Sequence, residues 1–443
     1  MMLGIKFGSF DYNIGKLALA LLERKGSLQY KSKVIDHVYD GIFWASEPLQ
    51  SIVDCHMRGF KAGQLSGDII SALSNLFMAI ATDYVAGQNL DVMQNNIMEL
   101  VSNLQRRGVK LFLKGAMLFL SQIMKLKDGL HMSHTSLFEN MPNENEIIAD
   151  PSSPPKLYVY DKVHRLSREF LFRQIEDDAY QLINFSDAIA MNHHQLDHTI
   201  LMGYFFEGLV SFLLVRRAMM SSSCKTGNEA SSMKLLMERG LSVLNQMRCY
   251  SEHSCWNWED KMLLLKAEKT YTQGDYDRAS SLYDSAIRSA HVHKFIHVEA
   301  IASELAAIFY HERGLHSQSY PYFVHSVKSY KEWGANVIAE RVETFLRDVV
   351  FINANTDATT CAGGAADILR QNQLEYIHTD ISASTPLGHL FGYSQDGKNK
   401  RHATEMLSQT ENDQAQNISG VFLEGCSTCQ HSSSKPLRYN LSL

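Results

Sequence analysis

Two histidines at helical spacing are the first residues in this sequence whose types suit metal chemistry. His194 and His198 lie four residues apart in NHHQLDH (192–198). Residues at this spacing share one face of a helix, and two imidazoles on one face can bind the same zinc ion. A zinc site also needs a third and a fourth ligand, and Asp197 falls on a neighbouring face. We therefore interpret the segment as the polar start of a helix.

A cysteine pair near the C-terminus is the second candidate. Cys426 and Cys429 form a C-x-x-C with His431 close by. A structural zinc site would need a second pair of ligands, and a redox pair would need a helix start that follows a strand. The sequence offers neither, so we expect loose cysteines. The seven cysteines are odd in number and scattered, which predicts a reduced, cytoplasmic chain with free thiols.

The remaining candidates have structural explanations. His291, His293 and His297 fall at an expected junction between two helices, so we interpret them as turn histidines. The acidic runs 176–178 and 259–260 lie in amphipathic segments, where solvated helix faces explain them.

Paired arginines at two places could suggest phosphate binding. They occur in QRRG (105–108) and RRAMM (216–220), near expected helix ends, where cations favour the negative end of the helix dipole. The chain has no G-x-x-x-x-G-K-[ST] motif and no H-R-D with D-F-G. We therefore predict no catalytic, cofactor-binding or metal-binding residue, no cofactor and no enzymatic activity.

Composition excludes further classes of protein. The formal net charge of -6 argues against a nucleic-acid platform, which needs a basic surface. The most apolar run, 203–215, contains Glu207 and is shorter than the roughly 20 residues of a spanning helix, so we expect no membrane segment. LALALL (17–22) is brief and lacks a cleavage site, which argues against a signal peptide.

The elements that organise the chain are clearest in YTQGDYDRASSLYDSAIR (271–288). Gly274 separates two segments of helical periodicity, and glycine can take the left-handed conformation that ends a helix. Asp275 is placed to cap the second helix with its carboxylate. The stretch predicts an antiparallel helix hairpin. Its two faces are Leu263, Ala267 and Tyr271 before the turn, and Ala279, Tyr283 and Ala286 after it.

The same pattern returns twice. Gly314 lies forty residues after Gly274, and SGDIISALSNLFMAIA repeats the offsets from Gly67. Recurrent hairpins of this kind indicate a helical repeat array. The positions expected to be structural are Gly67, Ala72, Ala79, Ala267, Gly274, Tyr276, Ala279, Tyr283, Ala286, Ala307, Gly314, Phe323, Trp333 and Gly334.

This unit, Gly-Asp-Tyr-x-x-Ala-x-x-x-Tyr-x-x-Ala, resembles the tetratricopeptide (TPR) repeat, with a longer period. Residues 256–344 resemble the helical-repeat region of large multidomain signalling kinases, on the words LLLKAEKTYTQGDYDRASSLYDSAI, HVEAIASELAAIFYHERG and YFVHSVKSYKEWGANVIAERVE. FGSFDYNIGKLALALLERKG (7–26) and GQLSGDIISAL (63–73) extend the resemblance to about 1–350, with a departure at 126–160. In that family a kinase-like domain and an AAA-type ATPase lie upstream, and a GAF sensor and a histidine kinase lie downstream.

The expected fold is all-α: a superhelical stack of antiparallel helix hairpins (a tetratricopeptide-like α-solenoid) with a disordered C-terminal tail. We expect N-terminal repeats over 1–130 with an incomplete first hairpin, a loop or linker over 131–160 and C-terminal repeats with two tetratricopeptide-like hairpins over 161–350. Residues 351–443 are polar and poor in aliphatic clusters, which predicts a mostly disordered tail.

The leading hypothesis is a non-catalytic scaffold for protein-protein or interdomain contacts in signal transduction, with a protein or peptide bound in a concave groove. The alternative is a fragment of a multidomain ATPase/histidine kinase whose catalytic domains lie outside the chain. A weaker third option is a small-molecule sensor with an apolar pocket between 195–220 and 230–250. The first hairpin lacks a full helix, so nothing caps the N-terminal edge of the array. We therefore expect Leu17 and Leu21 to be incompletely buried and this edge to self-associate.

Overall fold

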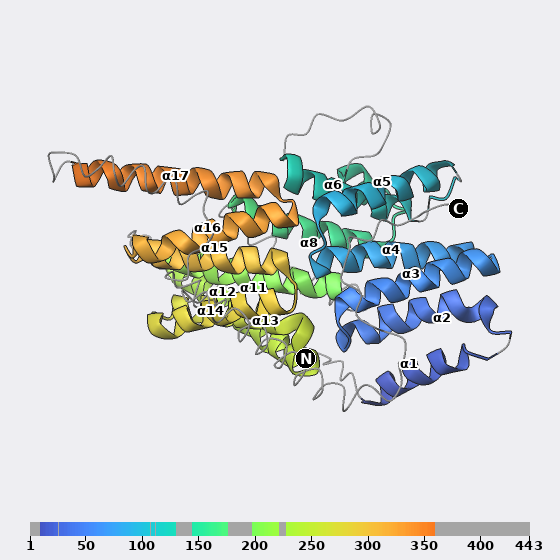
Figure 1. Ribbon diagram of the computed structural model, residues 1–443. Coiled ribbons are helices and arrows are strands. Elements are labelled where there is room, and N and C mark those ends of the chain that lie inside the picture. Colours follow the sequence, from blue (N-terminus) through green and yellow to red (C-terminus); the bar gives the residue numbers. More distant parts are fainter. Residues whose placement is uncertain are drawn as a thin grey trace, which may run out of the picture.

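The computed structural model describes residues 9–24, 26–106, 108–110, 112–129, 144–175, 197–220 and 227–358 (Figure 1). Every regular element in these ranges is helical, and they contain no strand. The predicted all-α class is confirmed. The low proline content and the many apolar residues at spacings of three and four favour helices throughout.

Long helices follow one another with short turns between many of them. The elements are α1 (Ser9–Leu21), α2 (Leu28–Gly41), the 3-10 helix η1 (Phe43–Ala45), α3 (Leu49–Ser66), α4 (Ile69–Ala86), α5 (Leu90–Arg106), α6 (Leu113–Asp128), α7 (Glu144–Ala149), α8 (Pro155–Phe172), α11 (His198–Met220), α12 (Gly227–His253), α13 (Cys255–Thr272), α14 (Tyr276–Val292), α15 (Ile296–Glu312), α16 (His316–Trp333) and α17 (Asn336–Ala358).

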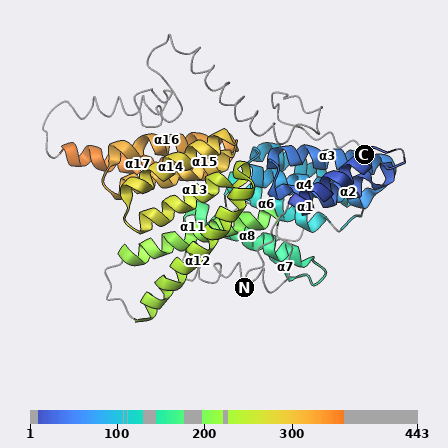
Figure 2. The same cartoon turned by 90° about the horizontal axis from the view of Figure 1, so that it is seen from below.

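Neighbours in the chain are neighbours in space. The most extensive helix contacts join α15 to α16, α3 to α4, and α13 to α14. In both views α2 to α6 lie on one side of the molecule and α11 to α17 on the other (Figures 1 and 2). The two sides are joined by contacts of α8 with α6 and α11, of α11 with α4 and of α17 with α6.

Left-handed residues mark the turns between helices. The turn residues that recur at a 20-residue spacing have φ angles between 63° and 95°, and four of them follow one another at 274, 294, 314 and 334. One helix with its turn therefore occupies 20 residues, which gives the forty-residue hairpin period predicted from Gly274 and Gly314. The left-handed turn residues with this spacing are Gly67, Gly87, Gly274, Lys294, Gly314 and Gly334.

The two aspartates that follow glycine cap helices. The backbone N–H of Arg278 donates to the Asp275 carboxylate over 3.4 Å, and that of Ser71 donates to Asp68 over 3.2 Å. Each bond satisfies a backbone donor that the first turn of a helix leaves without a partner. The cap predicted at Asp275 is confirmed. The first turns of α4 and α14 are therefore determined by the local sequence.

Most of the repeat positions with a side chain lie in the core. The buried ones are Ala72, Ala79, Ala267, Ala279, Tyr283, Ala286, Ala307, Phe323 and Trp333. Tyr276 differs from them, because 43% of it is exposed. It is the first residue of α14. Its ring lies beside the rings of Tyr271 and Phe309, and the guanidinium of Arg313 stacks on it.

Described helices cross two of the boundaries expected from the sequence. The linker expected over 131–160 contains α7, whose Ile147 is buried, and the start of α8. Pro155 is the first residue of α8, where its fixed φ suits a helix and its missing N–H is not needed. α17 continues to Ala358, beyond the expected start of the tail at 351. The rest of that tail lies outside the described residues.

Two core helices are apolar along their length. α4 and α11 are long and apolar enough to cross a membrane, but 72% and 94% of their apolar windows are buried inside the protein. Core helices of soluble proteins have the same composition. Glu207 of α11 is buried and lies 3.4 Å from the guanidinium of Arg239. Here most of the apolar surface of both helices is buried inside the protein.

Candidate functional site

An open polar cavity beside α8 has a volume of about 340 Å³. Its lining comes from α7 and α8. The residues from α8 are three and four positions apart, so they lie on one face of that helix. Gln174 joins them directly after the left-handed Arg173 that ends α8. The lining residues are Glu144, Asn145, Arg165, Arg168, Glu169 and Gln174.

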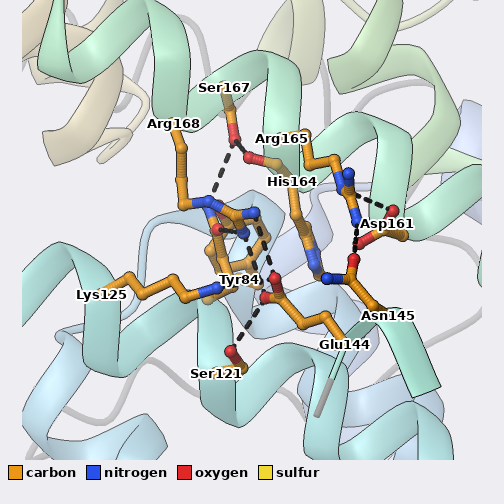
Figure 3. A network of polar contacts seen from close by, with 11 residues as sticks. Tyr84, Ser121, Lys125, Glu144, Asn145, Asp161, His164, Arg165, Ser167 and Arg168 are labelled. Carbon is orange, nitrogen blue, oxygen red and sulfur yellow. Dashed lines mark hydrogen bonds and ion pairs between the residues drawn. The ribbon is translucent and has the colours of Figure 1, made fainter. Parts of the chain in front are cut away.

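The carboxylate of Glu144 is held by donors from two helices (Figure 3). Ser121 Oγ donates to it over 2.8 Å, Lys125 Nζ over 2.6 Å and Arg168 over 3.3 Å. Burial alone would raise the pKa of Glu144, but the charge of Arg168 and the bonds from Lys125 and Ser121 outweigh it and hold the pKa below its usual value. Glu144 is therefore a fixed anion at neutral pH.

A chain of hydrogen bonds runs from the cavity into the core. Arg168 Nη1 donates to Gln122 Oε1 over 2.7 Å, and Gln122 Nε2 donates to the Tyr84 hydroxyl over 2.8 Å. At the cavity, Arg165 donates to Asn145 Oδ1 over 2.7 Å and lies 2.8 Å from an Asp161 carboxylate oxygen. These contacts tie α4, α6, α7 and α8 together and fix both arginines.

His164 lies behind the cavity with its ring between Tyr84 and Phe119. It is buried, and burial together with the charge of Arg168 lowers its pKa to about 3. The imidazole is therefore neutral at physiological pH.

The lining of the cavity can bind a polar group. It consists of guanidiniums, carboxylates and amides, and none of its residues is a serine, cysteine, threonine or histidine. Because Glu144 is held ionised, its carboxylate accepts hydrogen bonds and is not a general acid near neutral pH. Fixed arginines and amides can instead hydrogen-bond a polar group of a partner.

Buried carboxylates join helices elsewhere in the fold. Glu268 of α13 lies 2.6 Å from the guanidinium of Arg216, which stacks on the Tyr271 ring at 4.6 Å. Arg216 is thus a correction: it is buried, and its charge is matched by Glu268 rather than by a helix end. Glu304 of α15 likewise binds Arg173 and Arg341, each at 2.8 Å.

The acidic pair at 259–260 is also a correction. Asp260 was expected on a solvated face, but it is fully buried and lies 3.2 Å from Lys261. The Lys261 ammonium lies 3.6 Å from the centre of the Phe295 ring. The run 176–178 lies outside the described residues.

The structure describes four of the histidines named in the sequence analysis, His198, His291, His293 and His297. His198 is buried, with Nε2 at 3.2 Å from Thr82 Oγ1, whereas His194 lies outside the described residues, as do Cys426, Cys429 and His431. His291 lies 3.2 Å from the Glu299 carboxylate. His293 ends α14, in agreement with a turn histidine.

The place proposed for an apolar pocket is filled by close helix packing. A Cβ on Gly208 of α11 would lie 3.0 Å from the Val243 side chain of α12, and one on Gly240 of α12 would lie 2.8 Å from Phe212 of α11. Glycine at both positions lets the helices approach closely. The structure therefore does not favour the small-molecule sensor.

Comparison with known proteins finds no matching family model, no similar curated protein and no similar solved structure. The resemblance to the repeat region of signalling kinases therefore stays a prediction.

Proposed function

We propose that this chain is a cytoplasmic helical-repeat scaffold that mediates protein-protein contacts in signal transduction. In this proposal the helix pairs form a superhelical stack of antiparallel hairpins. The 20-residue spacing of the left-handed turns and the extensive contacts within consecutive pairs support it. Arrays of this kind act by presenting an extended surface to a partner.

The observation that carries the proposal is an apolar stripe on α1. Phe10, Ile14, Leu17 and Leu21 are 73%, 46%, 60% and 44% exposed. Their spacing of four, three and four residues places them on one face of the helix, as in a helix that packs against another helix. The predicted incomplete burial of Leu17 and Leu21 is confirmed. Exposed apolar side chains in such a row mark a protein interaction surface.

A second copy of the chain is the simplest partner for this stripe, and light scattering after size-exclusion chromatography tests it. The full chain should elute above its monomer mass at tens of micromolar. The double variant Leu17→Glu/Leu21→Glu should be monomeric, because a charge cannot be buried in an apolar interface. Leu235→Glu, at a 57% exposed position of α12, is the matched control and should behave as the parent does.

A clean monomer of the parent chain, with amide exchange in 14–24 as slow as in 260–290, would contradict the interaction surface.

The alternative function, a segment of a multidomain ATPase/histidine kinase, places a neighbouring segment of a longer protein on α1. A fusion with such a segment would then be monomeric and would hide the stripe. In both cases this chain alone should show no saturable ATP binding.

A further inference from the structure

A cysteine, a glutamate and a histidine meet where α13 begins and α14 ends. One ligand atom each of Cys255, Glu259 and His293 lies within 4.8 Å of the other two. Cys255 and Glu259 are four residues apart at the start of α13 and share a face, while His293 directly follows α14. Because the two helices pack along each other, residues 38 positions apart in the chain come together.

The neighbours of the cluster orient its ligands. Ser289 Oγ donates to Glu259 Oε2 over 2.9 Å and lies 3.3 Å from His293 Nδ1. A hydroxyl has one proton, and the carboxylate is the stronger acceptor for it. His293 Nδ1 is then the donor to Ser289, which leaves the lone pair on Nε2. In metal-binding histidines, the ring nitrogen that does not bind the metal usually donates a hydrogen bond to a neighbouring group, as His293 Nδ1 does here.

Contacts from α13 and from α3 fix the histidine. The Trp256 ring lies against the His293 ring, with centroids 4.8 Å apart. Gln50 of α3 accepts from Trp256 Nε1 over 3.0 Å and donates to the His293 backbone oxygen over 3.1 Å. The backbone after His293 is also constrained, because Lys294 has a φ of 63°. The imidazole is therefore placed by three elements.

We propose that Cys255, Glu259 and His293 bind one zinc ion and leave a fourth position open to water. Thiolate, imidazole and carboxylate are the ligands that zinc takes in proteins. Zinc–ligand bonds of about 2.0–2.3 Å place tetrahedral ligand atoms roughly 3.3–3.8 Å apart, so side-chain movements of about 1 Å close the site. The ion would pin the start of α13 to the end of α14, next to the contact with α3.

Cobalt serves as the spectroscopic probe. The full chain, treated with a chelator and then titrated with Co²⁺, should bind one equivalent and develop the thiolate-to-cobalt charge-transfer absorption. Zinc should displace the cobalt and remove the absorption. Cys255→Ser should lose the charge-transfer band, and His293→Gln should weaken cobalt binding by at least about tenfold.

Two controls identify the cysteine. Cys249→Ser changes an exposed thiol in the preceding helix α12, and Cys426→Ser/Cys429→Ser removes the C-x-x-C pair. Both should keep the band with unchanged affinity. Zinc should also protect Cys255 of the parent chain from alkylation, measured by mass spectrometry. A cobalt complex without the thiolate band, a band that survives Cys255→Ser, or alkylation unaffected by zinc would overturn the site.

Discussion

Lys294 stands in the turn after α14 where Gly274 stands in the turn after α13. Both residues are left-handed, with φ angles of 63° and 80°, and both separate two long helices. A left-handed conformation costs a residue with a Cβ about 1–2 kcal/mol, whereas glycine takes it freely. The turn that carries His293 is thus held in a conformation that its own sequence disfavours.

Lys294→Gly should stabilise the protein. Relief of the left-handed strain exceeds the entropy that glycine adds to the unfolded chain, which gives a gain of about 0.5–1 kcal/mol. Urea unfolding measures the difference. Gly274→Ala is the opposite change at the equivalent place and should destabilise by about 1 kcal/mol. Equal stability of Lys294→Gly and the parent would mean that the turn carries no strain.

Ala279→Leu should destabilise the pair of α13 and α14. Ala279 is fully buried, so a larger side chain must displace its neighbours at a cost of about 1–3 kcal/mol. Thermal or urea unfolding detects this change. Ser281→Leu adds the same side chain two residues away at an exposed position and should stay within about 0.5 kcal/mol of the parent. Similar melting of both variants would show that the helices are not closely packed at Ala279.

Arg216→Met should cost about 3–5 kcal/mol, because it leaves the buried carboxylate of Glu268 without its counter-ion. The double variant Arg216→Met/Glu268→Met should recover much of this loss, since it removes both charges from the core. A double-mutant cycle by urea unfolding gives the coupling. If the double variant is no more stable than Arg216→Met alone, the ion pair does not account for the cost.

Acid should destabilise the protein in part through His164. Its pKa is lowered from 6.5 to about 3 in the fold, so the folded state favours the neutral ring. A depressed folded pKa contributes stability that is fully present above pH 6.5 and is lost as the pH falls towards 3. The charges that bear on the ring are Arg168, Glu144 and Lys125.

His164→Phe tests this dependence, since an aromatic ring fits between Tyr84 and Phe119. The variant should lose less stability than the parent between pH 7 and pH 4, measured by urea unfolding at each pH. His37→Phe is the control, because 69% of the His37 side chain is exposed. Parallel pH profiles of the parent and His164→Phe would exclude the buried histidine as a cause.

Several features of this protein follow from the sequence alone. The helical periodicity around Gly274, the cap by Asp275 and the forty-residue spacing to Gly314 are local properties. They depend on backbone preferences and on apolar residues three and four apart, so they can be predicted without knowing what packs against them. The incomplete first hairpin predicted the exposed Leu17 and Leu21 of α1.

Tertiary structure decided the rest. The partner of Arg216 lies 52 residues along the chain, and Cys255 meets His293 only because α13 and α14 pack along each other. Asp260 looks like any exposed acid in an amphipathic helix, and only the neighbouring helices bury it with Lys261. The left-handed backbone of Lys294 could not be predicted from the sequence either, because packing of the flanking helices imposes a conformation that a lysine disfavours. Charges and ligands acquire their partners across elements, and that pairing is fixed by how the helices stack.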